Sequence, residues 1–302
     1  MPAKQKIRVA PRHIIESMLS RPANLLLLSL ILLSSGILSS GIAATAPAAP
    51  AKSGRFYLGF DKNTYPGDDL LPALHQTFSF TGYWLNNPPG AASNPWVGRR
   101  ATLRSAGFGF LILFNGRTDA ELRGHDAASL GKADADAAVD AALREGFPAG
   151  ATIYLDQEEG GRLLPEQADY LGAWITWVSY SDFHPGVYCS GIRVRDGKDV
   201  ITTAGDIAQR FPDPDLELHF WVLNDQTPPS PGCTPLRLNP SKSGFPAASV
   251  WQYARSPRGS EPDTSAKGYA PGNLCYAPGL PHSEHTFLDL DTSRSPDPSQ
   301  GR

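Results

Sequence analysis

Residues 152–162 read TIYLDQEEGGR and place three carboxylates within four positions. Asp156, Glu158 and Glu159 follow an apolar, β-branched run directly, and two glycines follow them. Charge of this density at the end of a buried strand costs free energy unless it is paired or used. Three roles are open for it: a catalytic carboxylate cluster, a metal site, or a polar junction between a strand and a loop.

Further acids lie at the ends of other apolar runs. Asp61 follows FYLGF, and Asp289 and Asp291 lie in HTFLDLD. Because strand side chains alternate between faces, Asp156 and Glu158 should share one face, as should Asp289 and Asp291. If these strand ends meet, the acids repel and at least one should have a raised pKa. A protonated acid beside an ionised partner is what cleavage of a glycosidic bond requires. We predict Asp61, Asp156 and Glu158 as catalytic residues.

Other uses of these acids were weighed. Each acid could cap a helix or pair with Arg99, Arg100 or Arg162. The acids could also ligate Ca²⁺ or Mg²⁺, but the chain has no D-x-D-x-D-G loop. His282 and His285 are three residues apart in a Pro-rich segment, which is a poor zinc signal, and no G-x-S-x-G motif indicates serine chemistry. We therefore expect a carboxylate site with no metal and no cofactor.

Aromatic residues lie near several of the same strand ends. Aromatic rings offer flat apolar faces on which the C–H faces of sugars can stack, and tyrosine adds a hydroxyl group. Together with two of the acids they form the predicted substrate-binding set, which is Tyr83, Tyr188, Trp221, Trp251, Asp289 and Asp291.

The elements that must position these residues alternate along the first part of the chain. Short apolar runs indicate buried strands, and helical spacing appears between them, most clearly in KADADAAVDAALREGFP and PEQADYLGAWITWVSYS. This order is typical of parallel βαβ units with right-handed crossovers. The expected strands are 56–60, 78–85, 108–114, 151–155 and 185–190.

The pattern changes after a helix expected near residues 198–210. Three further strands are expected at 216–224, 248–254 and 285–291, with Pro/Gly/Ser-rich connections that lack helical periodicity. Eight parallel strands of this length close into an α/β, TIM-like barrel. An open doubly wound sheet is the alternative, but it would need a Gly-rich phosphate loop after its first strand, and FDKNTYPGDD is not one.

Residues 1–51 are expected to be a signal peptide or an N-terminal membrane anchor with a linker. A basic leader precedes the apolar core LLLLSLILL, and small residues follow, as in secretory signals. The uncharged stretch 25–43 is long enough that an uncleaved anchor remains open, and this segment is the only expected membrane contact. Either way the barrel domain, residues 54–293, is exported. Residues 294–302 are expected to be a disordered tail.

The net charge and the cysteines indicate which partners and which redox compartment to expect. The net charge is −3 and the sequence has no basic patch, which argues against nucleic acid as a partner. Cys233 and Cys275 lie in Pro/Gly-rich connections of the exported part and are predicted to form a disulfide. Cys189 follows the apolar run GVY and is expected to be a buried free thiol. We expect a monomer.

Several of these motifs together resemble one family. They are GFD at the end of the first strand, G-x-x-D-A-x-x-A ahead of G-F-P-x-G-x-x-I-Y-x-D-x-E, GVYCS, and the late WQY and LDLD. They resemble the secreted domain of unknown function described as glycoside-hydrolase-like, common in actinobacterial envelope proteins. That domain is similar to the Chalaropsis-type lysozymes of glycoside hydrolase family 25. The likeness covers about residues 54–293.

The resemblance implies a (β/α)₅β₃ barrel and roles for individual residues. It implies Glu158 as the acid, Asp156 as its partner, and Asp61 and Tyr188 at the strand ends where the lysozymes have their counterparts. Either Asp289 or Asp291 would hold the late acidic position. The sequence departs from the lysozymes at LDQEEGG.

The function implied is that of an exported, lysozyme-like glycoside hydrolase that acts on a cell-envelope polysaccharide, with peptidoglycan as the leading candidate. A catalytically inactive barrel that binds envelope glycan or serves as a structural module is the alternative.

Overall fold

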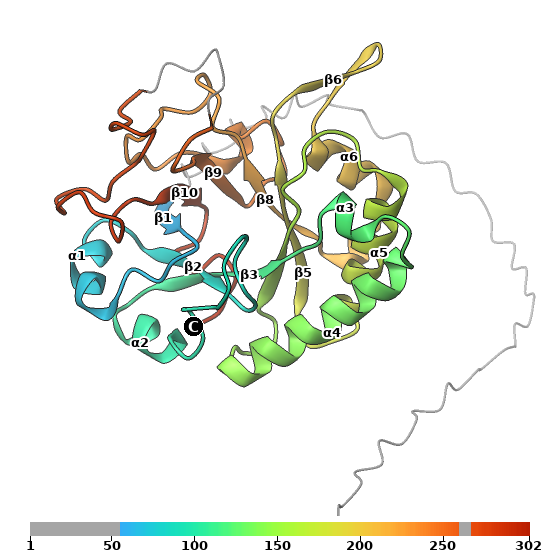
Figure 1. Ribbon diagram of the computed structural model, residues 1–302, viewed down its shortest axis with the longest axis horizontal. Coiled ribbons are helices and arrows are strands. Elements are labelled where there is room, and N and C mark those ends of the chain that lie inside the picture. Colours follow the sequence, from blue (N-terminus) through green and yellow to red (C-terminus); the bar gives the residue numbers. More distant parts are fainter. Residues whose placement is uncertain (1–54, 260–266) are drawn as a thin grey trace, which may run out of the picture. The chain divides into compact units, whose positions relative to one another are not determined.

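The computed structural model describes residues 55–259 and 267–302, so the expected signal or anchor segment at 1–51 lies outside the described residues. The described part forms a closed eight-stranded barrel in the order β1-β10-β9-β8-β5-β4-β3-β2 (Figure 1). The predicted TIM-like barrel is confirmed. Its strands are β1 (Tyr57–Asp61), β2 (Phe80–Trp84), β3 (Gly109–Asn115), β4 (Thr152–Asp156), β5 (His184–Ser190), β8 (His219–Leu223), β9 (Val250–Ala254) and β10 (Asp289–Ser293).

The last strand runs against the others. Neighbouring strands from β1 to β9 are parallel, whereas β10 is antiparallel to both β9 and β1. The prediction of eight parallel strands is therefore wrong for β10. The described residues between β9 and β10 contain no helix, so no crossover returns the chain to the far end of the barrel. As a result, Asp289 starts β10 at the end where β1 finishes, and it pairs with Asp61.

Helices follow the first five barrel strands, which gives the (β/α)₅β₃ arrangement. In Figure 1, α4 and α5 lie side by side, and α5 packs against β5. They can approach closely because α4 presents Gly131, where a Cβ atom would lie 2.2 Å from the carbonyl oxygen of Tyr170. The helices are α1 (Leu71–His75), α2 (Arg100–Ser105), α3 (Asp119–Leu122), α4 (Ala127–Glu145), α5 (Pro165–Ser179) and α6 (Thr203–Arg210).

The helix expected near 198–210 is shorter than predicted. Its first residues belong to a hairpin of β6 (Val194–Asp196) and β7 (Asp199–Ile201), which turns at Gly197 with φ of 61°. An Asp-Gly pair between short strands is a strong hairpin signal. Helix α6 begins only after Thr202, whose hydroxyl oxygen accepts a hydrogen bond from the Gly205 N–H at 3.0 Å.

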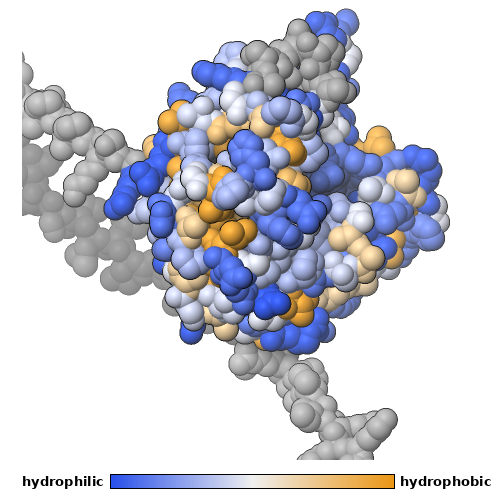
Figure 2. Space-filling model, turned by 60° about the vertical axis from the view of Figure 1, so that its left-hand side comes forward, coloured by the Kyte–Doolittle hydropathy of each residue, from blue (hydrophilic) through white to orange (hydrophobic). Residues whose placement is uncertain are grey.

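The described residues bury a large aromatic core. Trp96, Trp174, Trp221 and Trp251 are among its largest fully buried side chains. On the face drawn in Figure 2, hydrophobic residues appear as small, separate patches among hydrophilic ones. No helix within residues 55–259 and 267–302 is long and apolar enough to cross a membrane.

The cysteines are arranged as the sequence indicated. Cys233 and Cys275 form a disulfide, and Cys189 is a buried free thiol. The disulfide joins the connection after β8 to the connection between β9 and β10. Two long segments without regular helices are thereby tied together beside the barrel.

The C-terminal tail is ordered, so the prediction of disorder at 294–302 is wrong. The Asp297 carboxylate accepts a hydrogen bond from the Phe110 N–H at 2.8 Å. The Ser299 hydroxyl oxygen accepts one from the Ile112 N–H at 2.9 Å, and its carbonyl oxygen accepts one from the Thr152 N–H at 2.9 Å. The polar residues that suggested disorder bond to the backbone of β3 and β4 instead.

We predict that Ser299→Ala lowers the free energy of unfolding by about 1–2 kcal/mol, because it leaves the buried Ile112 N–H without an acceptor. Urea denaturation of the full-length protein would measure the change. Ser105→Ala, at an exposed position at the end of α2, is the matched control and should change stability by less than about 0.5 kcal/mol. Equal effects of the two substitutions would contradict the structural role of the tail.

Candidate active site

The structure brings the predicted acids together at one end of the barrel. Asp61 and Asp156 are the last residues of β1 and β4, and Asp289 is the first residue of β10. Asp61, Asp156 and Asp291 are only 5%, 6% and 0% exposed. Their charges affect one another's pKa, as expected for converging carboxyl groups.

A glutamine that the sequence analysis missed connects these acids. Gln252 on β9 donates from Nε2 to the Asp61 carboxylate at 2.8 Å and accepts a hydrogen bond from the Tyr188 hydroxyl at 2.7 Å. It also reaches Asp289 at 3.4 Å. Because β1 and β5 are not neighbours of β9, these bonds cross the barrel interior. The sequence did carry a signal for Gln252. In the WQY motif, strand alternation places Gln252 on the opposite face of the strand from Trp251.

The carboxyl groups of Asp61 and Asp291 affect each other's pKa inside the barrel. Burial is the main cause that raises the pKa of Asp291 well above its ordinary value, and the charge of Asp61 adds to it. Burial also raises the pKa of Asp61 to about 6, although hydrogen bonds from Asp291 and Gln252 oppose the shift. The Trp221 indole N–H donates to the Asp291 carboxyl group at 2.9 Å. This hydrogen bond lowers the pKa of Asp291, but burial and the charge of Asp61 outweigh it, so Asp291 has the more strongly raised pKa of the two.

Two more carboxyl groups have raised pKa values. Burial raises the pKa of Asp156 well above its ordinary value, and the charges of Glu158 and Asp61 add to the shift. Burial and the charge of Asp61 do the same for Asp289, although the Ser256 N–H donates to its carboxyl group. Within the described residues, the Asp156 Oδ1 atom has no hydrogen-bond partner. In this part of the chain, no three His, Cys, Asp or Glu side chains are placed to hold a metal ion.

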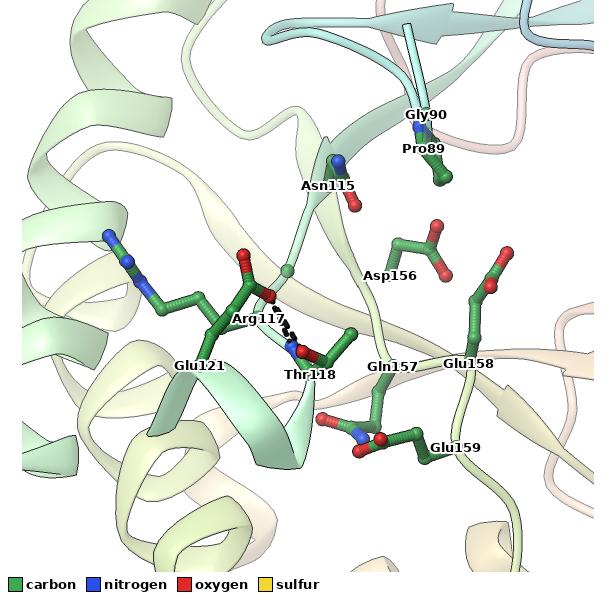
Figure 3. A pocket seen from close by; sticks show the side chains of 11 residues that line it. Pro89, Gly90, Asn115, Arg117, Thr118, Glu121, Asp156, Gln157, Glu158 and Glu159 are labelled. Atoms are coloured by element: carbon green, nitrogen blue, oxygen red, sulfur yellow. Dashed lines mark hydrogen bonds between the residues drawn. The ribbon is translucent and has the colours of Figure 1, made fainter. Parts of the chain in front are cut away.

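A pocket opens beside Asp156. It has a volume of about 310 Å³ and lies between the loops that follow β2, β3 and β4. Figure 3 shows Asp156 and Glu158 pointing to one side of their segment, and Gln157 and Glu159 pointing to the other. Glu158 is exposed, whereas Asp156 lies buried behind it. The predicted shared face of Asp156 and Glu158 thus continues past the end of β4.

Glu159, the third acid of the segment, holds the surrounding structure. Its carboxylate accepts a hydrogen bond from the Asp119 N–H, at the start of α3, at 2.8 Å. It also accepts one from the side-chain amide of Gln167 in α5. Glu159 therefore fixes the loop after β4 to two helices. Glu159, the extra acid of the LDQEEGG segment, therefore has a structural role.

Three of the predicted substrate-binding aromatic residues are buried. The Tyr83 ring packs on the helix side of the barrel and its hydroxyl donates to Glu145. The Trp251 indole N–H donates to the backbone carbonyl of Asn224. Trp221 packs against Tyr188 inside the barrel. Tyr83, Trp221 and Trp251 are at most 1% exposed, so none of them offers a ring face to a sugar.

Comparison with known proteins gives a family match. The family model for the Rv2525c-like, glycoside hydrolase-like domain matches residues 81–257. No curated protein matches the chain.

Similar solved structures include an uncharacterized protein of B. stearothermophilus, with 19% identity over 78% of this chain and 94% of that chain and a TM-score of 0.52. The Tat-secreted protein Rv2525c of Mycobacterium tuberculosis has 15% identity over 80% of this chain and 96% of its own, with a TM-score of 0.47. A family 25 glycosyl hydrolase from Bacillus anthracis has 11% identity over 83% and 95%, with a TM-score of 0.43.

We predict that Asp61→Asn makes stability less dependent on pH. The folded pKa of Asp61 is raised from 3.8 to about 6, so its contribution to stability is complete below pH of about 4 and is lost as the pH rises through 6. This shift corresponds to about 3 kcal/mol. The fall in the free energy of unfolding between pH 4 and pH 7.5 should be smaller in the variant by about that amount.

Urea unfolding at several pH values would measure this difference. Asp140→Asn, at an exposed position on α4, is the control and should leave the pH dependence of wild type unchanged. A parallel pH dependence of Asp61→Asn and wild type would show that the buried acids do not hold protons as described.

Proposed function

The chain belongs to the Rv2525c-like, glycoside hydrolase-like domain family, and from this premise we propose that it is exported and acts on a cell-envelope polysaccharide, with peptidoglycan as the leading candidate substrate. One observation carries the proposal: exposed Glu158 and buried Asp156, a carboxyl group with a raised pKa, line the same pocket. Cleavage of a glycosidic bond needs a proton donor and a second carboxyl group at the bond.

The two residues of the pocket act as a pair. The charge of Glu158 adds to the effect of burial in raising the pKa of Asp156, so the two carboxyl groups lie close enough to interact. Glu158 is the exposed member, so it contacts the glycosidic oxygen and delivers the proton as the general acid. Asp156 is its partner carboxyl group, and its ionised form stabilises the positive charge that develops on the sugar or activates water.

Asp61 positions the substrate or the attacking water. Its carboxylate is held by the Gln252 amide and by Asp291, so its orientation is fixed before substrate binds. Tyr188 is held by the same amide oxygen of Gln252 and packs against Trp221. Groups that are held in place in this way need no rearrangement during the reaction.

Export is supported by the chemistry of the cysteines and by the N-terminal sequence. The Cys233–Cys275 disulfide is stable in an oxidising compartment and is rare in the cytosol. The leader pattern of residues 1–51 is that of a secretory signal or an uncleaved anchor.

The burial of the acid cluster favours a second candidate function, a barrel that binds envelope glycan without cleaving it. Asp61, Asp156 and Asp291 are almost fully covered. This arrangement restricts the contact of a glycan with the cluster to Glu158 and the rim of the pocket.

We predict that the full-length protein releases reducing ends from purified cell walls and that Glu158→Gln lowers the rate at least about 100-fold, because the amide has no proton to donate. Glu166→Gln, in the first turn of α5, is the matched control and should keep the wild-type rate. Reducing-end assays on cell walls and a panel of polysaccharides would measure the rates.

Pull-down on insoluble cell walls separates the two functions. Wild-type turnover that Glu158→Gln abolishes, with binding retained, supports the hydrolase. Binding without turnover by wild type supports the non-catalytic barrel. Equal release by wild type and Glu158→Gln would exclude the proposed acid.

A further inference from the structure

Lys62 is a buried cation that follows Asp61 directly at the same end of the barrel. It is 5% exposed. Its ammonium group donates to the backbone carbonyl of Glu284 at 3.1 Å and lies 4.7 Å from the centre of the Phe287 ring. Within residues 55–259 and 267–302, no carboxylate oxygen lies within 4.0 Å of it. A buried ammonium group without a paired anion is costly.

Burial also changes the pKa of Lys62. Burial lowers its pKa to about 8, although the negative charges of Asp289 and Glu284 act in the opposite direction. These two carboxyl groups are too distant to pair with the ammonium group directly. A lysine in such an environment is unusual unless it binds something else.

Lys62 lines a second pocket at the same end of the barrel. This pocket has a volume of about 270 Å³ and is lined also by Thr64, Ser256, Phe287 and Asp289. It lies over β1, β9 and β10, whereas the pocket with Glu158 lies over β2, β3 and β4, the next strands around the barrel. Gln252 contacts Asp289, which lines the Lys62 pocket, and also Asp61. The charge of Asp61 in turn affects the pKa of Asp156, which lines the pocket with Glu158.

We propose that the Lys62 pocket binds a carboxylate group carried by the glycan, so that the substrate is an acidic polysaccharide. This inference rests on the proposed function and narrows its substrate class. A carboxylate would supply the anion that Lys62 lacks, and the polar residues Thr64 and Ser256 line the same pocket.

The charge of the pocket favours a single negative charge. The raised pKa of Asp289 favours its neutral form, which limits its repulsion of an anion in the pocket. One ammonium group then balances one carboxylate. A phosphate with two negative charges would leave a buried excess of negative charge, because Lys62 is the only cation among the described residues that line this pocket.

Binding to purified cell walls tests the proposal without requiring turnover. Two probes are used. The first is cell walls with their carboxyl groups intact. The second is the same walls after carbodiimide and methylamine have converted these groups to neutral amides, a treatment that leaves phosphodiesters unchanged. Full-length wild type is expected to bind amidated walls at least about tenfold more weakly. Its affinity for intact walls should also fall as the pH rises above about 8, where Lys62, facing Asp289 and Glu284, loses its charge.

Lys62→Met removes the charge and keeps the length of the side chain. The variant should bind both kinds of wall equally and weakly, and its Tm without ligand should equal or exceed that of wild type, because an unpaired buried charge is removed. Lys242→Met, at an exposed position, is the control and should keep the wild-type preference.

Two results would overturn the proposal: a wild type that binds amidated walls as tightly as intact walls, or a Lys62→Met variant that keeps the preference. A Tm of Lys62→Met well below wild type would assign Lys62 a structural role instead. Loss of Glu158-dependent turnover concerns only the proposed hydrolase, because the binding preference is measured separately.

Discussion

Several aspartates can share one barrel interior only if protons and hydrogen bonds take the place of water around them. In this protein, Gln252 does much of this. Its amide nitrogen donates to Asp61 and its amide oxygen accepts from Tyr188, so that strands on three sides of the barrel are linked. Asp291 has a raised pKa and accepts a hydrogen bond from Trp221. Removing Gln252 or Trp221 would take a hydrogen-bond donor away from a buried carboxyl group.

The reversed direction of β10 determines which acids meet. A parallel last strand would have placed its first residue at the opposite end of the barrel from Asp61. Because β10 enters antiparallel, Asp289 lies beside Asp61, and Asp291 lies one strand repeat deeper, next to Trp221. The segment that leads into β10 also brings Phe287 and the Glu284 carbonyl to Lys62. One topological choice therefore builds both the acid cluster and the pocket beside it.

Acids of similar appearance in the sequence have different tasks in the structure. Asp156 lies buried at the end of a strand, Glu158 is exposed in the pocket, and Glu159 holds two helices. Asp297, in a tail of polar residues, fixes the start of β3. The surroundings of each carboxyl group decide its protonation and its task, since burial, nearby charges and hydrogen bonds shift a pKa independently of the residue type.

Local patterns in the sequence were enough to predict the alternating strands and helices and the Cys233–Cys275 disulfide. They also predicted that Asp61 and Asp156 lie at strand ends and that Asp156 and Glu158 share a face. These features depend on residues that are close together in the sequence, because strand side chains alternate every two residues and turn residues lie between the strands.

Four features became clear only from the folded chain. Tyr83 and Trp251 are buried, and Gln252 faces the interior. Strand β10 is antiparallel, and the C-terminal tail is ordered. The period of a strand separates two faces but does not say which one is turned inward. Strand direction and tail binding depend on partners far along the chain, and only the closed barrel brings those partners together.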